Sequence, residues 1–274
     1  MAAFSDGDTG GNPAGVALLD AFPSDETMQR IAAEIGYSEA AFAVREGTAW
    51  RVRYFAPATE IPFCGHATIA LGAALARAHG DGTFPLVLND ARIAVEGRAG
   101  AGTLAATLQS PPTRSELAPA TLVEEALALF GYTPADLDSR LPPALAHGGS
   151  DHLLLALRTR EALAAMRYDF DAGRDLMLRA GIVTIALVHA EAPSRFHTRN
   201  AFAAGGVYED PATGSAAAAL AGYLCGRDWP HRGVIEIVQG EDMGQRSLLR
   251  ATLPDVPGAP VAVSGQARLI QPAP

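Results

Sequence analysis

The sequence predicts an α/β (α+β) protein made of two similar lobes, each built around a central helix. Signals for strands and helices alternate along the 274 residues. A Glu-x-Pro-x-x-Gly motif occurs at residues 60–65 and again at 209–214, an offset of 149 (209 − 60). Each copy leads into an apolar helix rich in small residues, and one copy lies on each side of the proline pair 111–112. Two copies of one strand–turn–helix arrangement indicate two related lobes.

Residues 111–113, Pro-Pro-Thr, are the best candidate for a linker, because two prolines do not readily continue a ladder or a helix. We therefore predict an N-terminal lobe over residues 1–112 and a C-terminal lobe over residues 113–259. The last strand signal, near residues 260–274, is a candidate to complete the N-terminal lobe.

In the N-terminal lobe the clearest helix follows Ser24, a residue type that caps helix starts. Apolar side chains recur at residues 28, 31, 32 and 35, the spacing of one helix face, and Gly36 ends the pattern. A second helix is predicted from residues 65–66 to Gly80. Strand signals cover residues 12–19, 39–44, 50–55, 86–88, 92–95 and 103–108.

The C-terminal lobe repeats this alternation. A helix is predicted over residues 121–130, ended by Gly131, and a very Ala-rich helix over residues 215–225, ended by Gly226. Strand signals cover residues 153–157, 182–189, 196–202, 234–238, 248–253 and 261–269.

Composition and charge exclude several classes of protein. Apolar residues make up 49% of the chain, enough for a packed core, and the net charge of −9 (21 − 30) argues against nucleic acid as a partner. No unbroken apolar run is long enough for a membrane span, and the first residues do not resemble a signal peptide. The two cysteines, Cys64 and Cys225, fit free thiols in a reducing cytoplasm, so we expect a cytoplasmic protein.

The sequence lacks the usual cofactor motifs. It has no P-loop, no G-x-G-x-x-G following a strand, no HExxH and no clustered His and Cys spacing. We therefore predict neither a nucleotide or flavin cofactor nor a metal.

The starts of the two central helices are candidate anion sites. A helix N-terminus offers unsatisfied N–H groups and a partial positive charge, and a glycine lets a ligand approach the backbone closely. Gly65 with His66, and Gly214 with Ser215, therefore suit a small carboxylate. Alternatively both glycines are ordinary helix starts, with Ser215 a cap and His66 a structural hydrogen-bonding group. A nucleophilic Ser215 is disfavoured because no G-x-S-x-G elbow surrounds it.

Two carboxylates are the candidates for proton transfer. Glu39 opens an apolar strand, where neighbouring Ala and Phe side chains would exclude water from it, as suits a group that exchanges protons with a substrate. Asp210 precedes Pro211, which stiffens the turn before the second central helix. The alternatives are that Glu39 is an exposed edge residue and that Asp210 simply forms the turn.

Four motifs together resemble the PhzF isomerase family of phenazine biosynthesis, in the same order along the chain. They are Gly-Asn-Pro-Ala (11–14), Ser-Glu-Ala-Ala-Phe (38–42), Phe-Ala-Pro (55–57) with Glu-Ile-Pro-Phe-Cys-Gly-His-Ala-Thr (60–68), and Glu-Asp-Pro-Ala-Thr-Gly-Ser-Ala (209–216). The resemblance implies a diaminopimelate epimerase-like fold: two lobes, each a curled mixed sheet around a central helix, with the active site between them. The chain departs from the family in having Ala40 where Thr is frequent, and in a short segment before Asn12.

The resemblance also implies site residues and an assembly. Glu39 matches the family's catalytic acid/base, and the other matches are His66 and Asp210, which line the site with Ser215. Gly65 and Gly214 would give backbone donors to a substrate carboxylate, and Asn12 belongs to the substrate-binding set. A homodimer is expected on the same ground.

Related epimerases of this fold use two opposed cysteines. The resemblance places Cys64 at one such position, but its repeat counterpart is Thr213, and Cys225 lies well along the second helix. A thiol pair is therefore not expected.

The predicted activity is a cofactor-independent isomerase that moves a proton between carbons of a small carboxylate by general acid/base catalysis. Two alternatives remain open. One is an epimerase or racemase of a hydroxy- or amino acid, using Glu39 with Asp210 or Cys64. The other is a non-catalytic dimer that binds small carboxylates.

Overall fold

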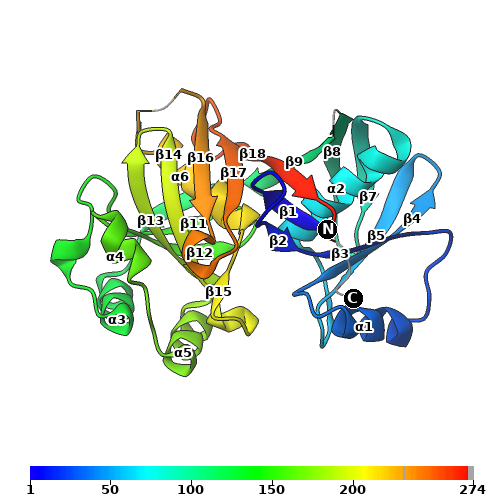
Figure 1. Ribbon diagram of the computed structural model, residues 1–274. Helices are drawn as coiled ribbons and strands as arrows, with labels where there is room; N and C mark the ends of the chain where they lie inside the picture. The colour runs from blue at the N-terminus through cyan, green and yellow to red at the C-terminus, as the bar shows by residue number, and fades with distance from the viewer. Residues whose placement is uncertain (101, 231, 271–274) are drawn as a thin grey trace. The chain divides into compact units, whose positions relative to one another are not determined.

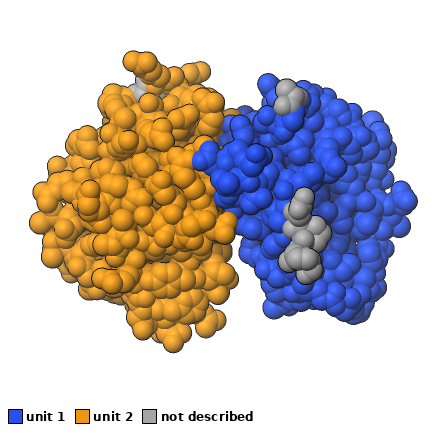
Figure 2. Space-filling model, viewed as in Figure 1, with its two compact units in different colours: residues 1–109, 264–274 blue, residues 110–263 orange. Residues whose placement is uncertain are grey.

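The computed structural model describes residues 1–100, 102–230 and 232–270. Contacts within the chain divide it into two compact units (Figure 2), one of residues 1–109 and 264–274 and one of residues 110–263. The part of the predicted last strand at residues 271–274 lies outside the described residues. Among the described residues, no helix combines the length and apolar character that crossing a lipid bilayer requires.

Unit 1 is a mixed sheet around one helix (Figure 1). Its strands are β1 (Ala2–Ser5), β2 (Asn12–Pro13), β3 (Gly15–Leu19), β4 (Ala40–Glu46), β5 (Ala49–Phe55), β6 (Glu60–Ile61), β7 (Gly82–Val87) and β8 (Arg92–Gly100), with the first part of β9 (Thr103–Pro112) and the end of β18 (Pro260–Arg268). β3 pairs with β4, and β5 with β7, in parallel, whereas β4–β5, β5–β6, β7–β8 and β8–β9 are antiparallel. β1 lies antiparallel to both β2 and β18.

The helix inside unit 1 is α2 (Gly65–His79), and ten of its fifteen residues are buried. It contacts strands from β1 to β8, which explains why nearly every side chain along its first three turns is small or apolar. Its backbone lies so close to β8 that a Cβ on Gly97 would come within 2.2 Å of the Gly72 carbonyl oxygen. The predicted helix at Ser24 is α1 (Asp25–Glu34), with the Ser24 hydroxyl accepting from the Thr27 N–H at its start.

Unit 2 contains a second mixed sheet. Its strands are β10 (Arg114–Leu117), β11 (Ala144–His147), β12 (Asp151–Ala156), β13 (Thr184–Ala192), β14 (Arg195–Ala201), β15 (Glu209–Asp210), β16 (Val234–Gln239) and β17 (Ser247–Thr252), with the end of β9 and the start of β18. β12–β13 and β14–β16 are parallel, whereas β10–β11, β11–β12, β13–β14, β14–β15 and β16–β17 are antiparallel.

The central helix of unit 2 is α6 (Gly214–Cys225), a run of mostly buried Ala and Leu side chains that contacts β10, β11, β12 and β17. The helices α3 (Ala120–Phe130), α4 (Arg160–Ala164) and α5 (Phe170–Ala180) share a second apolar core with the strands β12 and β13. Short 3-10 turns lie at Pro134–Asp136, Ala203–Gly205 and Glu241–Met243.

The two units repeat one topology. The series β3, β4, β5, β6, α2, β7, β8 corresponds to β12, β13, β14, β15, α6, β16, β17, with the same parallel or antiparallel sense at every matching pair. The bounds of β6 and β15, and the starts of α2 and α6, are separated by the same 149 residues as the sequence motif (209 − 60 and 214 − 65). The internal repeat is therefore a structural one.

The structure corrects several expectations. Pro111 and Pro112 do not interrupt the chain, because β9 runs through them: an extended backbone suits the fixed φ of proline, and the missing N–H groups cost little where neighbours keep the pairing. Thr113 N–H donates to the Gly258 carbonyl, and the Ser110 hydroxyl accepts from Val261 N–H. The segment before Asn12 is short, but it forms the fully buried strand β1. The pair β10–β11 was not predicted, since β10 is exposed at every residue and has no apolar alternation.

Candidate functional site

The first N–H groups of α2 are not capped by the side chain of the N-cap residue. Cys64 is its N-cap residue but gives no side-chain cap, and the first turn holds no acidic residue. The turn is held instead by Thr68, whose hydroxyl donates to the Cys64 carbonyl at 2.6 Å and lies 2.7 Å from the Tyr54 hydroxyl. The orphan N–H groups of the first turn therefore remain for a ligand.

Glu39 lies beside this helix start. It is the last residue before β4, and its carbonyl accepts from Gly15 N–H across β3. Its side chain is 15% exposed and that of His66 is 9% exposed, with Glu39 Oε2 3.3 Å from His66 Nε2. The alignment does not make a hydrogen bond, so the buried Oε2 has this contact with His66 but no hydrogen-bond partner among the described residues. A carboxylate oxygen kept from water and left without a donor is suited to exchange a proton with a substrate.

A thiol completes this group. Cys64 Sγ lies 3.4 Å from His66 Nδ1, and ligand atoms of Glu39, Cys64 and His66 all lie within 4.8 Å of one another. Oxygen, sulfur and nitrogen donors at these separations could hold a soft divalent cation such as zinc. They also place a second proton carrier next to Glu39.

The start of α6 is built around Thr213 and Asp210. Thr213 is the N-cap residue, again without a side-chain cap, and its hydroxyl donates to Asp210 Oδ2 at 2.5 Å. Gln239 on β16 locks the turn, because its amide oxygen accepts from Thr213 N–H and its amide nitrogen donates to the Asp210 carbonyl at 2.7 Å. The Asp210 carboxylate and the first turn of α6 are therefore held in a fixed relation.

Ser215 lies inside the first turn of α6 rather than at its cap, because the helix begins at Gly214. Its hydroxyl oxygen is 3.1 Å from Nε2 of His152, a residue on β12 with no exposed surface. His152 Nδ1 lies 2.8 Å from the Thr184 hydroxyl. Burial lowers the pKa of His152 to about 3, so the imidazole is neutral at any physiological pH.

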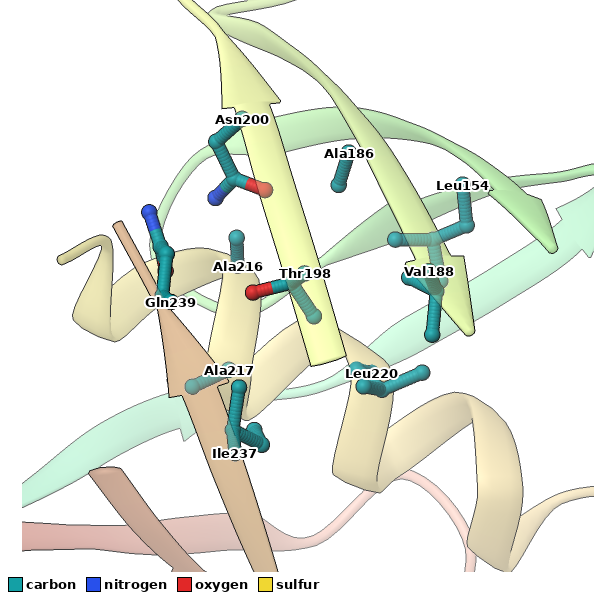
Figure 3. A pocket seen from close by; sticks show the side chains of 10 residues that line it. All are labelled: Leu154, Ala186, Val188, Thr198, Asn200, Ala216, Ala217, Leu220, Ile237 and Gln239. Carbon is teal, nitrogen blue, oxygen red and sulfur yellow. The ribbon is translucent and has the colours of Figure 1, made fainter. Parts of the chain in front are cut away.

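A small cavity of about 10 Å³ lies beneath the same helix turn (Figure 3). Ala216, Ala217 and Leu220 of α6 line one side, and the figure shows the Thr198 and Asn200 side chains one after the other along β14. The Thr198 hydroxyl and both ends of the Asn200 amide have no hydrogen-bond partner among the described residues.

Thr198→Val tests whether this hydroxyl has a partner in solution. Valine has nearly the same shape, so the change removes an unsatisfied buried group and leaves the packing in place. We expect the free energy of unfolding to stay equal or rise by up to about 1 kcal/mol, measured by urea denaturation. A loss of more than about 1 kcal/mol would instead show that the hydroxyl is bonded, for example to a water in the cavity.

Gly148 is a second sensitive position beside α6. A Cβ there would meet Ala219 N at 2.4 Å and the Ser215 carbonyl at 2.5 Å, both of them backbone atoms. Gly148→Ala should therefore displace the first turns of α6 and destabilise the protein by about 1–3 kcal/mol. The control is Gly100→Ala, since nothing lies within 4 Å of a Cβ at that position. Equal thermal stability of the two variants would contradict the close approach.

A duplicated ion pair was not anticipated from the sequence. Arg53 on β5 binds Glu60 on β6, and Arg199 on β14 binds Glu209 on β15, with shortest N–O distances of 2.6 and 2.5 Å. In the strand register Glu60 lies opposite Phe55, and Glu209 lies opposite Ala201. Each arginine lies two residues before that opposite residue on its own strand. Arg53 lies 7 residues before Glu60 and Arg199 lies 10 residues before Glu209, so the two arginines do not share the 149-residue offset of the motifs and the sequence spacing does not reveal the repeat of the pair. Both pairs anchor the strand that precedes a central helix.

The predicted site residues fall into two groups. Unit 1 brings together Glu39, Gly65 and His66, and unit 2 brings together Asp210, Gly214 and Ser215 around one helix start. Asn12 is buried in β2. Three residues further along the chain, Gly15 pairs with Ala40, the residue that follows Glu39. Sequence reasoning missed the supporting side chains His152, Thr184 and Gln239, because each comes from a strand far from the motif it supports.

The structure places the two cysteines as the sequence predicts. Cys64 and Thr213 occupy the same N-cap position in the two repeats, and Cys225 is the last residue of α6, with its thiol donating to the Pro254 carbonyl. Burial raises the pKa of the Cys225 thiol. The start of α6 therefore carries no thiol that could match Cys64.

Comparison with known proteins places the chain among related sequences. A family model described as phenazine biosynthesis-like protein, PhzC-PhzF, matches residues 1–272. An uncharacterized isomerase of Pseudomonas aeruginosa is 37% identical over 236 residues, which cover 82% of this chain and 80% of the relative. The trans-2,3-dihydro-3-hydroxyanthranilate isomerase of Pseudomonas fluorescens is 32% identical over 250 residues, covering 88% of this chain and 84% of the relative.

Solved structures share the fold. A PhzF-family phenazine biosynthesis protein of Bacillus anthracis gives a TM-score of 0.83 at 20% identity, covering 98% of this chain and 97% of that protein. A probable proline racemase of Agrobacterium radiobacter gives a TM-score of 0.62 at 12% identity, covering 95% and 90%. The predicted diaminopimelate epimerase-like fold class is confirmed.

Proposed function

Because the chain belongs to the PhzC-PhzF family of phenazine biosynthesis-like proteins, we propose that it is an isomerase of a small carboxylate that works without a cofactor. Relatives that are 32% and 37% identical over most of the chain are named isomerases, which supports this class of activity. In this proposal Glu39 carries the proton, and the N–H groups at a helix start suit the substrate carboxylate.

The observation that carries the proposal is the state of Glu39. Its Oε2 atom is buried, lacks a hydrogen bond among the described residues and lies 3.3 Å from His66 Nε2. A structural glutamate at this place would be expected to have its oxygens paired, as those of Glu60 and Glu209 are. His66, on the first turn of α2, is close enough to orient the carboxylate as its charge changes.

Carboxylate binding is supported at the start of α6. The first turn has no side-chain cap and no acidic residue, so its N–H groups can bind an anion. Ser215 adds a hydroxyl on the same turn. The Asp210 carboxylate accepts a hydrogen bond from the Thr213 hydroxyl, and this bond fixes the position of the carboxylate at the start of α6.

The proposed reaction balances within the substrate. Glu39 takes a proton from an activated carbon, and the C–H electron pair moves into the adjoining conjugated system. The double bond shifts, and Glu39 returns the proton to another carbon on the same face. Such catalysis contributes roughly 10²–10⁴-fold, and orientation of the bound substrate supplies much of the remainder.

The test is exchange with solvent deuterium. The protein is incubated in D₂O with trans-2,3-dihydro-3-hydroxyanthranilate, the compound named for the Pseudomonas fluorescens relative, and with a panel of other cyclic and acyclic carboxylates. We expect proton NMR to show a shifted double bond in at least one of them, with deuterium at the newly saturated carbon in the turnovers in which the Glu39 carboxyl group exchanges its proton with D₂O between the two transfers. A panel that includes compounds with acidic C–H bonds and shows neither exchange nor conversion contradicts the proposal and favours a non-catalytic binding protein.

An epimerase is a second candidate because of Cys64. Its thiol lies 3.4 Å from His66 and could serve as a second acid/base beside Glu39. The same experiment separates the two, since an epimerase introduces deuterium at one carbon with inversion and leaves the double bonds in place.

Glu39, Cys64 and His66 could also hold a metal ion, but the proposed chemistry needs the Glu39 carboxylate free. We therefore expect activity to survive prolonged treatment with EDTA, and added Zn²⁺ to inhibit. Loss of activity with EDTA and its return with a divalent metal would overturn the cofactor-independent proposal.

A further inference from the structure

A buried chain of three polar side chains ends at the start of α6. It begins with Thr184 at the first residue of β13, passes through His152 on β12 and ends at Ser215. Thr184 and His152 have no exposed surface, and β12 and β13 hold them side by side in register (His152 opposite Thr184). Three groups linked at 2.8 and 3.1 Å in a fixed frame leave few choices for their hydrogens.

The hydroxyl hydrogen of Thr184 determines which groups donate and which accept along this chain of hydrogen bonds. Within the described residues, His152 Nδ1 is the hydrogen-bond partner given to the Thr184 hydroxyl, so the hydroxyl must donate to Nδ1 or leave its hydrogen unsatisfied in a dry interior. An unsatisfied buried donor costs about 1–3 kcal/mol. Nδ1 is therefore an acceptor. A neutral imidazole carries one N–H, which must then be on Nε2.

The Nε2–H group faces Ser215. Since Nε2 donates, the Ser215 oxygen accepts, and its own hydrogen is free to point away from His152. We propose that Thr184 and His152 position Ser215 as a hydrogen-bond donor for the carboxylate of the substrate, with His152 as a positioning residue. The identity of the ligand in this inference rests on the proposed function. The directions of the two hydrogen bonds do not, because they follow from the side chains themselves.

This order also explains what Ser215 does not do. A serine nucleophile needs an adjacent imidazole nitrogen that accepts its proton, and in hydrolases an aspartate holds the other nitrogen protonated. Here a hydroxyl donor takes the place of that aspartate, so the histidine has the opposite tautomer and cannot act as the base. The Ser–His–Thr chain is therefore a binding device rather than a catalytic triad.

The directions of the hydrogen bonds along Thr184, His152 and Ser215 should not change with pH near neutrality. Burial lowers the pKa of His152 to about 3, with Asp151 raising it and His147 lowering it to smaller extents. His147 Nδ1 lies 2.9 Å from Asp151 Oδ1 on the neighbouring strand ends, and the same carboxylate pairs with Arg114 at 2.6 Å. His152 should stay neutral and keep one tautomer between about pH 5 and 9.

The direct test is the tautomer of His152 in the full-length protein. Two-bond ¹⁵N–¹H correlation spectra, assigned by comparison with His152→Gln, should show an unprotonated Nδ1 and a protonated Nε2 across that range. A protonated Nδ1, or an imidazolium signal at neutral pH, overturns the inference. This readout needs no substrate, so it remains valid if the proposed function fails.

Two substitutions test the functional consequence. His152→Gln keeps the order, since its amide oxygen can accept from Thr184 and its NH₂ group can donate to Ser215, whereas His152→Leu has neither group. The probe is anthranilate, and 2-aminobenzamide, which lacks the charge, is the matched control; calorimetry gives both affinities. We expect His152→Leu and Ser215→Ala each to lose about 10-fold or more of the preference for the acid over the amide, and His152→Gln to keep most of it.

A double variant separates positioning from general damage. If His152 acts through Ser215, His152→Leu adds little to the loss already caused by Ser215→Ala. With a turned-over substrate, the same losses should appear in KM more than in kcat. Additive losses, or an unchanged preference in His152→Leu with a native thermal transition, would contradict the positioning role.

Discussion

Glu39→Gln is expected to lower the rate of proton exchange between substrate and solvent by at least about 10²-fold and by up to about 10⁴-fold. Glutamine keeps the shape of the side chain and its burial beside His66 but cannot accept or return a proton. Because the groups that bind the carboxylate are untouched, the affinity for anthranilate should stay within about threefold of the original value.

The measurement is deuterium uptake from D₂O followed by NMR, with ligand affinity determined on the same preparation. Glu46→Gln is the matched control, since Glu46 is an exposed residue at the far end of β4, the strand that begins directly after Glu39. Retention of more than about a tenth of the original rate in Glu39→Gln would reject Glu39 as the acid/base, since the loss would fall below the usual range for such a group.

Glu209→Ala should destabilise unit 2 by about 3–5 kcal/mol, because it leaves a buried guanidinium with only Asp242, 4.0 Å away, as a counter-charge. The side chains of Arg199 and Glu209 are 9% and 3% exposed and meet at 2.5 Å, and Arg199 also donates to the Ala164 carbonyl. Hydrogen bonding to Glu209 counters the effect of burial and keeps the pKa of Arg199 above its ordinary value. Urea or thermal denaturation provides the measurement.

The repeat supplies the control for this prediction. Glu60→Ala removes the corresponding pair in unit 1, where the side chains of Arg53 and Glu60 are 17% and 27% exposed and Arg53 keeps Asp25 as a second partner. We expect a loss of no more than about 1 kcal/mol there. Equal losses in the two variants would show that burial does not set the strength of the pair.

Much of the fold was predictable because its patterns are local. The apolar spacing after Ser24, the glycines that end α3 and α6, and the small-residue runs of α2 and α6 each depend on neighbours within a few residues. The motif repeat also predicted the relation between the two units, since it marks the strand–turn–helix segment that both topologies share. The strand β10 was missed because an exposed, charged strand has no apolar alternation to reveal it, and its partner β11 was missed because it is only four residues long.

The site was predictable only in its motif residues. Glu39, His66, Asp210 and Ser215 stand in recognisable segments, and the contacts of His66 with Cys64 and of Asp210 with Thr213 span only two and three residues of chain. Gln239 and His152 lie 26 and 63 residues from the groups they bond, so only the register of β12, β13 and β16 shows that they belong there. Side chains that orient a site from a neighbouring strand leave no spacing pattern in the sequence.

The position of β18 has a consequence for how the protein is made. β1 is buried in unit 1 beside β18, with Ala2 opposite Arg268, whereas unit 2 is one continuous stretch of chain. As the ribosome releases the polypeptide from its first residue onward, the unit that emerges first is the last to gain all its strands. Unit 2 needs the chain as far as residue 263, five residues before Arg268 (268 − 263), but β1 is made first and so waits longest for its partner strand, and until then its apolar surface is available to chaperones.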